Sequence, residues 1–184
     1  MLHVTIPPTE LWDEANERFI RVNKSTTLAL EHSLVAISKW ESKWCKPFLT
    51  KDEKTAEEII DYVRCMTVTQ NVDPNVYLCI SEKVIREINA YIAAPMTATV
   101  IREYGVNKPN REIVTSELIY YWMVALNIPF ECQKWHLNRL LTLIRICNIK
   151  NRPPDKSNRL SQRETLEQYA ALNAARRKAM NSKG

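Results

Sequence analysis

The chain has 184 residues, of which 45% are hydrophobic and 26% are charged, a globular composition that excludes a disordered or fibrous polypeptide. Its net charge of +5 is unevenly placed: nine basic and three acidic residues lie from Lys150 onwards, a balance of +6, which leaves −1 for residues 1–149. Only two glycines are present, Gly105 and Gly184, so the glycine-rich loops that bind nucleotide phosphates are excluded.

The first 30 residues are predicted to form a small antiparallel β element. Val4 and Ile6 alternate with polar residues, as in a strand that buries one face. The segments 18–22 and 26–30 are rich in strand-forming residues and flank the turn-like segment 23–25.

Two amphipathic helices are predicted to follow. Apolar residues recur at steps of three and four over residues 34–44, and Pro47 ends this pattern. Thr55 and Glu58 have the spacing of a capping box, in which two side chains bind free amides at the start of a helix. An apolar stripe continues from there to Met66.

The middle of the chain predicts a third helix, a loop and a strongly apolar fourth helix. Ser81 is positioned to cap a helix that Pro95 ends. Residues 97–110 contain helix breakers and are expected to form a loop or a short strand. Residues 115–126 are apolar almost all round, which predicts a central helix that is buried on most sides.

Another helix is predicted after Asn127 and Pro129, and it should form a helical hairpin with the preceding one. Its apolar stripe consists of Leu137, Leu140, Leu141, Ile144 and Cys147. Arg152, Pro153 and Pro154 then mark a domain boundary.

A last helix is predicted beyond this boundary, because Ser161 and Glu164 form a second capping box. It contains few large apolar residues and should dock weakly. The sequence therefore predicts a mainly α protein: a compact helical domain over residues 1–150 with a small N-terminal antiparallel β element, and a basic linker and C-terminal helical tail over residues 151–184.

Few residues suggest enzymatic or metal chemistry. Cys132 and His136 have helical ligand spacing, but two ligands do not make a structural zinc site. His3 and His32 are not accompanied, in the spacing of the sequence, by the orienting group and oxyanion donor of a nucleophilic site. We therefore predict no catalytic residue, no metal site and no cofactor.

The compartment follows from the cysteines and from the hydropathy. Five cysteines are an odd number, and the start of the chain lacks a basic, apolar leader, so reduced thiols in a cytosol are expected. No apolar run reaches the roughly 18 residues of a membrane helix, so a soluble protein without a membrane partner is expected.

Two features are candidates for binding other molecules. Trp40 and Trp44 lie four residues apart on one helical face, each after a lysine, and fit either a hydrophobic anchor for a partner or an ordinary core position. Arg176, Arg177 and Lys178 concentrate the positive charge of the tail, which attracts acidic surfaces or phosphates. Nucleic acid is not the expected partner, because Tyr169 is the only aromatic residue of the tail.

Two stretches have an unusual composition: LEHSLVAISKWESKWCKPFL at residues 30–49 and YYWMVALNIPFECQKWHLNRLLTLIRICNIK at residues 120–150. Together they resemble the tail assembly chaperones of long-tailed bacteriophages, which are encoded just before the tape measure protein. The similarity extends from Thr5 to the Ala-Arg-Arg cluster near the C-terminus.

The resemblance implies a helical protein of the host cytoplasm that covers the apolar tape measure protein before the tail tube polymerises around it. It also implies that the C-terminal tail helps to recruit tail tube protein, and self-association is compatible with the sequence. The family has no catalytic residues. The alternative is a basic nucleic-acid-binding protein or a head-tail structural protein of the virion.

Overall fold

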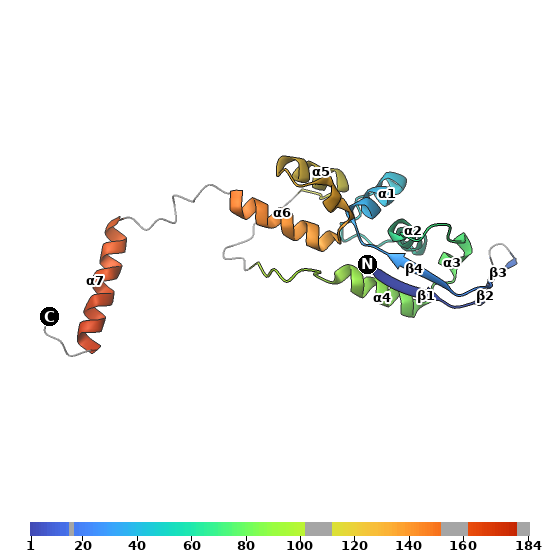
Figure 1. Cartoon of the computed structure of the whole chain (residues 1–184), viewed down its shortest axis with the longest axis horizontal. Coiled ribbons are helices and arrows are strands. Elements are labelled where there is room, and N and C mark those ends of the chain that lie inside the picture. The colour runs from blue at the N-terminus through green and yellow to red at the C-terminus, as the bar shows by residue number, and fades with distance from the viewer. Residues whose placement is uncertain (15–16, 102–111, 152–161, 180–184) are drawn as a thin grey trace. The chain divides into compact units, whose positions relative to one another are not determined.

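The computed structural model describes residues 1–14, 17–101, 112–151 and 162–179 (Figure 1). The chain divides into two compact units, Met1–Cys147 and Asn148–Gly184, and each is considered by itself. Seven α-helices, one short 3-10 helix and four short strands make up the regular structure of the described residues. The predicted class, mainly α with a small antiparallel β element, is confirmed.

The β element is a long hairpin that contains two short antiparallel ladders. Strand β1 (Leu2–Ile6) pairs with β4 (Thr26–Leu30), and β2 (Thr9–Asp13) pairs with β3 (Arg18–Val22). The segments 18–22 and 26–30 are strands as predicted, but they do not pair with each other. They follow one another along the same side of the hairpin, so segment 23–25 is a corner rather than a hairpin turn.

At the corner between the two ladders, the two sides of the hairpin have different numbers of residues. Ile6 faces Thr26 and Thr9 faces Val22, so two residues on one side oppose the three residues 23–25 on the other. The two residues on the short side are prolines, which have no backbone N–H to donate to a ladder. The ladder therefore breaks here, and β2 continues with the opposite alternation of faces from β1.

Helices α1 (Leu34–Trp44) and α2 (Ala56–Met66) form where predicted and pack against each other. The Ser33 side chain caps α1 by accepting a hydrogen bond from the Ala36 amide. Both halves of the predicted capping box are present at the start of α2. After α2 the chain turns back along β4, where the Val68 amide donates to the Ala29 carbonyl at 2.8 Å.

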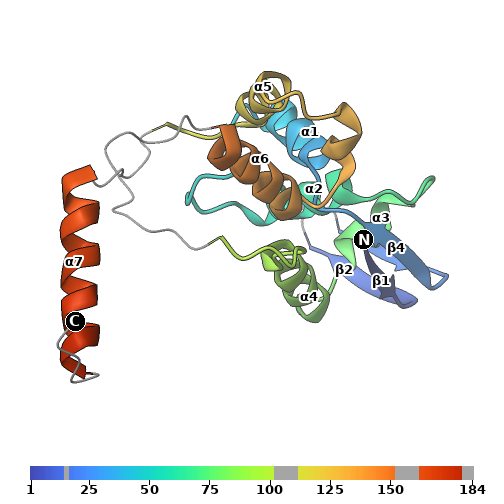
Figure 2. The same ribbon diagram turned by 60° about the vertical axis from the view of Figure 1, so that its left-hand side comes forward.

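A short helix that the sequence did not reveal, α3 (Pro74–Leu78), precedes α4 (Glu82–Ala93). Asp73 caps α3, and a proline at its first position suits a helix start. Ser81 caps α4 as predicted. Helix α3 contacts β3, and α4 lies on the β1 side of the hairpin, as Figures 1 and 2 both show.

The second half of the first unit contains α5 (Ser116–Ala125), the 3-10 helix η1 (Phe130–Lys134) and α6 (Leu137–Asn151) as far as Cys147. The two α-helices have the predicted positions, but α5 packs mainly against α1 instead of forming a close hairpin with α6. The predicted burial of α5 on most sides is wrong. Ser116, Ile119 and Met123 are buried, whereas Tyr121 and Val124 are exposed.

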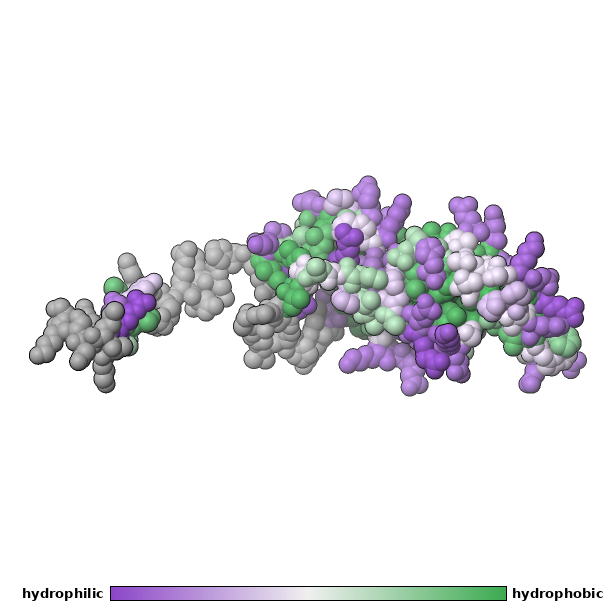
Figure 3. Space-filling model, turned by 60° about the horizontal axis from the view of Figure 1, so that its bottom comes forward, coloured by the Kyte–Doolittle hydropathy of each residue, from purple (hydrophilic) through white to green (hydrophobic). Residues whose placement is uncertain are grey.

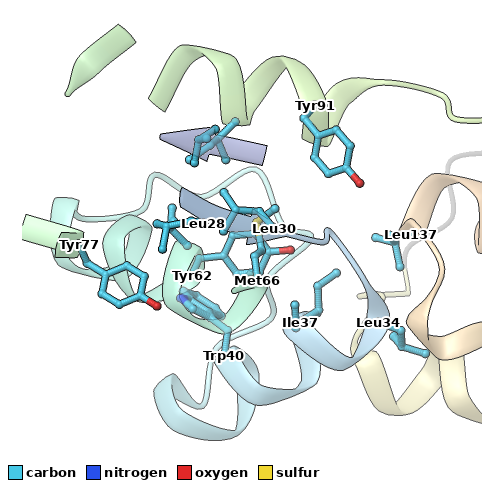
Figure 4. Packing of buried hydrophobic residues seen from close by; sticks show 14 of the residues in the cluster. Leu28, Leu30, Leu34, Ile37, Trp40, Tyr62, Met66, Tyr77, Tyr91 and Leu137 are labelled. Carbon is cyan, nitrogen blue, oxygen red and sulfur yellow. The ribbon is translucent and has the colours of Figure 1, made fainter. Parts of the chain in front are cut away.

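The hydrophobic core lies between α1, α2, α4, α6 and the β1–β4 ladder (Figure 4). The view shows side chains from these elements directed at one another, including Leu28, Leu30, Ile37, Trp40, Met66 and Leu137. One face of the ladder supplies Val4, Ile6, Leu28 and Leu30, all buried. The apolar spacings of the separate elements thus converge on one core.

The second unit contains α7 (Gln162–Ala179), the predicted last helix. Leu166, Tyr169 and Leu172 are exposed along it. The predicted boundary at residues 152–154 and the capping residue Ser161 lie outside the described residues.

Candidate protein-binding surfaces

Trp40 is a core residue and offers no surface to a partner. Its side chain is 1% exposed, and its indole N–H donates to the Glu58 carbonyl of α2 at 2.9 Å. Phe48 packs edge-on against the indole, with ring centroids 5.2 Å apart. The prediction of Trp40 as an anchor for another protein is therefore corrected: the residue anchors α1 on α2 within the chain.

Trp44 is half-buried and belongs to a charged cluster at the end of α1. Its indole N–H donates to one carboxylate oxygen of Asp61 at 3.0 Å, and the Lys43 ammonium donates to the other at 2.6 Å. Burial raises the pKa of Asp61, but the hydrogen bonds from Lys43 and Trp44 outweigh this and hold the pKa below its ordinary value. The exposed edge of Trp44 is small, so its first role is to join α1 to α2.

A second charged pair joins the residues just after α1 to the first turn of α2. The Lys46 ammonium and the Glu58 carboxylate are 2.5 Å apart, and Glu58 also accepts the Thr55 amide. The hydrogen bond from Lys46, followed by that from Thr55, lowers the pKa of Glu58. The lysines near the tryptophans therefore bind carboxylates of this chain.

Two buried histidines join the N-terminal half of the unit to α6. The rings of His32 and His136 lie 5.1 Å apart, and the Tyr62 hydroxyl is 2.5 Å from His32 Nδ1. Burial, and then the neighbouring His136, lowers the pKa of His32 to about 4. The Leu137 amide donates to the His32 carbonyl at 2.7 Å. Both rings are therefore neutral parts of the core at neutral pH.

Three of the exposed apolar side chains of the second half lie on α5 and η1. Tyr121 is 65% exposed, Val124 is 59% exposed and Phe130 is 53% exposed. The half-buried Tyr120 connects them, because its ring centroid is 6.4 Å from that of Phe130. These four residues are called the α5–η1 surface below. Exposed apolar groups that cluster in this way are typical of sites that bind other proteins.

Figures 1 and 2 show α5 near α6 at one end of the first unit, and Figure 3 shows apolar side chains at the surface of that end. Sequence reasoning found the apolar helix but missed its exposed side. The signal was present, since a short helix that is apolar almost all round buries every side only if neighbours enclose it.

A second exposed apolar group lies on the hairpin. Trp12 of β2 and Phe19 of β3 are direct cross-strand partners, and their rings meet edge-on with centroids 4.8 Å apart. Beside them Arg21 donates to Glu10 at 2.7 Å. Charged side chains therefore lie next to this aromatic pair. Cross-strand aromatic pairs of this kind stabilise a hairpin without any partner.

The predicted basic cluster lies in the last turns of α7. Arg176 is exposed, and the side chains of Arg177 and Lys178 lie outside the described residues. This cluster belongs to the second unit, whereas Trp40 and Trp44 belong to the first.

In the part of the chain that the structure describes, no three His, Cys, Asp or Glu residues are placed to hold a metal ion, and the five cysteines are free thiols. None of the described helices combines the length and hydrophobicity needed to cross a bilayer. Comparison with protein-family models, with curated proteins and with solved structures finds no match for this chain.

Proposed function

We propose that the chain is a tail assembly chaperone of a long-tailed bacteriophage, which binds the tape measure protein and helps to recruit tail tube protein. The observation that carries this proposal is the α5–η1 surface. It exposes Tyr121 and Val124 on α5, whose opposite side is buried in the core, and Phe130 at the start of η1. A surface of this kind binds the apolar stripe of a client helix by burying both.

The positions of the two resembling stretches support the proposal. Residues 30–49 contain α1, and residues 120–150 contain most of α5, together with η1 and α6. Helix α1 contacts both α5 and η1. The residues that carry the family resemblance therefore form one continuous module, with the exposed apolar side chains on its outer side.

The client is expected to be protected from aggregation while the surface is occupied. A tape measure protein presents long apolar stripes, and these associate with one another when nothing covers them. The α5–η1 surface covers one short helical segment at a time, so many copies of the chaperone bind along one client chain. No bond is made or broken in this process.

The proposal is tested by producing the full chain together with the tape measure protein of its phage and measuring how much client remains soluble and co-purifies. The variant Tyr121→Ser/Val124→Ser should lose the client. The matched control Trp12→Ser/Phe19→Ser removes a similar exposed apolar pair from the hairpin and should keep it. A client that is equally soluble without the chain would overturn the proposal, as would a nucleic-acid affinity that falls steeply with salt.

A further inference from the structure

His136 occupies the position just before α6, and both nitrogens of its ring are bound. Nε2 lies 3.1 Å from the Tyr91 carbonyl at the end of α4, and since a carbonyl only accepts, Nε2 carries the proton and donates it. Nδ1 lies 3.3 Å from the Asn138 amide, which donates to it. The ring therefore acts as a helix cap in a single form, the neutral one with the proton on Nε2.

This cap satisfies an amide that has no partner inside the helix. The first amides of an α-helix lack an acceptor one turn earlier. Here the Leu137 amide donates to the His32 carbonyl, the Asn138 amide to His136 Nδ1, and the Arg139 amide to the His136 carbonyl. The Asn138 side chain in turn donates to the Ile92 and Ala94 carbonyls of α4. The His136 imidazole thus links the first turn of α6 to the end of α4, through the Asn138 amide on one side and the Tyr91 carbonyl on the other.

Protonation would reverse the chemistry of the cap. A charged imidazole has N–H groups on both nitrogens, so Nδ1 would face the Asn138 amide with donor against donor. The new positive charge would lie at the N-terminus of α6, which is the positive end of the helix dipole. It would also lie in a residue that is 6% exposed.

The charged and titratable groups around the ring do not remove this conflict. His32 faces it at 5.1 Å between centroids, and the Tyr91 ring packs edge-on at 4.9 Å. The Glu31 carboxylate favours a charged imidazole, but it already accepts the Tyr91 hydroxyl at 2.7 Å and lies 3.0 Å from the Met1 amino group. Burial has the largest effect on the pKa of His136 and lowers it below its ordinary value.

We propose that His136 is a pH-sensitive cap, which holds the first turn of α6 on the end of α4 only while its imidazole is neutral. Acidification releases this turn before the rest of the unit opens. The inference is independent of the proposed function, because it concerns the attachment of α6 and no client.

The test is hydrogen exchange of the full chain between about pH 7 and about pH 5, corrected for the pH dependence of intrinsic exchange. Protection over residues 137–141 should fall by up to about tenfold per pH unit, the limit for one linked proton, while α2 keeps its protection. His136→Asn should abolish this slope, since asparagine is a good cap that does not titrate. The matched control His3→Asn changes an exposed histidine of β1 and should keep it.

An unchanged slope in His136→Asn would overturn the proposal, and so would equal loss of protection in α2. If His136→Asn does not fold, the imidazole nitrogen resonances of the wild-type chain provide the second measurement. They should report a neutral ring with the proton on Nε2 until the α6 amides lose protection. A charged ring in a chain whose α6 amides remain protected would contradict the cap.

Discussion

Glu41 and Ser116, 75 residues apart in sequence, are joined by a hydrogen bond of 2.7 Å from the Ser116 amide to a carboxylate oxygen of Glu41. The other oxygen accepts the Phe48 amide, also at 2.7 Å. The side chain is buried, and it places a negative charge at the N-terminus of α5, where the helix dipole favours it. One carboxylate thus connects α1 to the helix that carries the α5–η1 surface.

Replacing this carboxylate should destabilise the first unit. Glu41→Gln removes the charge and leaves one of the two amides without a full acceptor, so the free energy of unfolding should fall by about 1–3 kcal/mol. Urea denaturation followed by circular dichroism measures this. Glu53→Gln, at an exposed position, is the control and should change stability by less than about 0.5 kcal/mol. Equal effects of the two variants would contradict the role of Glu41.

The two sides of α5 should respond differently to the same change. Met123 is 0% exposed and Val124, its neighbour, is 59% exposed. Met123→Ser buries a hydroxyl and leaves a cavity, which should cost about 2–5 kcal/mol of stability. Val124→Ser should leave the thermal midpoint nearly unchanged. A similar loss in both variants would mean that α5 is enclosed on both sides.

Trp40→Phe should destabilise the contact between α1 and α2. The phenyl ring leaves part of the indole volume empty and leaves the Glu58 carbonyl without its donor, at an expected cost of about 2–3 kcal/mol. Denaturation monitored by near-ultraviolet circular dichroism measures the loss. Trp12→Phe, on the exposed side of the hairpin, serves as control. A Trp40→Phe variant of wild-type stability would contradict the role of the Trp40 indole in joining α1 to α2.

Acid should weaken the same contact through its carboxylates. The pKa of Glu58 is lower in the folded chain than its ordinary value of 4.5, chiefly through the hydrogen bond from Lys46. A lowered pKa contributes stability above the unfolded value, and this contribution is lost as the pH falls through the folded value. Stability should therefore decline below about pH 4.5, and Glu58→Gln should flatten the decline while lowering stability at neutral pH. A decline of equal steepness in that variant would exclude Glu58 as its source.

If the tail recruits tube subunits by charge, the variant Arg176→Glu/Arg177→Glu/Lys178→Glu should reduce tube protein binding at low salt and leave client binding by the first unit intact. The reason is that long-range attraction depends on the net charge of α7 and is screened by salt. Titration of labelled tube protein at two salt concentrations measures it. Binding that does not respond to the triple change would remove electrostatic recruitment.

Local chemistry made most of the helices predictable from sequence. The capping box of Thr55 and Glu58 and the cap at Ser81 involve neighbours within one turn, so the residues that form them are visible together in the sequence. The same is true of the apolar spacing of α1. The short helices α3 and η1 were not predicted, because five residues are too few to display a helical period.

Long-range relationships were not predictable in the same way. The pairing of β1 with β4 depends on the unequal corner at residues 7–8 and 23–25, which no strand propensity reveals. The exposed side of α5 depends on where α1 lies. The capping role of His136 depends on the end of α4, 45 residues earlier. Each of these needs the fold to be known before the residue can be understood.

The proline corner of the hairpin also restricts how this protein can change in length. Removing or adding a single residue at Pro7 or Pro8 would exchange the two faces of β2. The face that carries Trp12 would then turn towards the core, and the face that carries Leu11 would turn away from it. Two residues added together would restore the alternation. Natural variants of the hairpin should therefore differ in length at this corner by even numbers of residues.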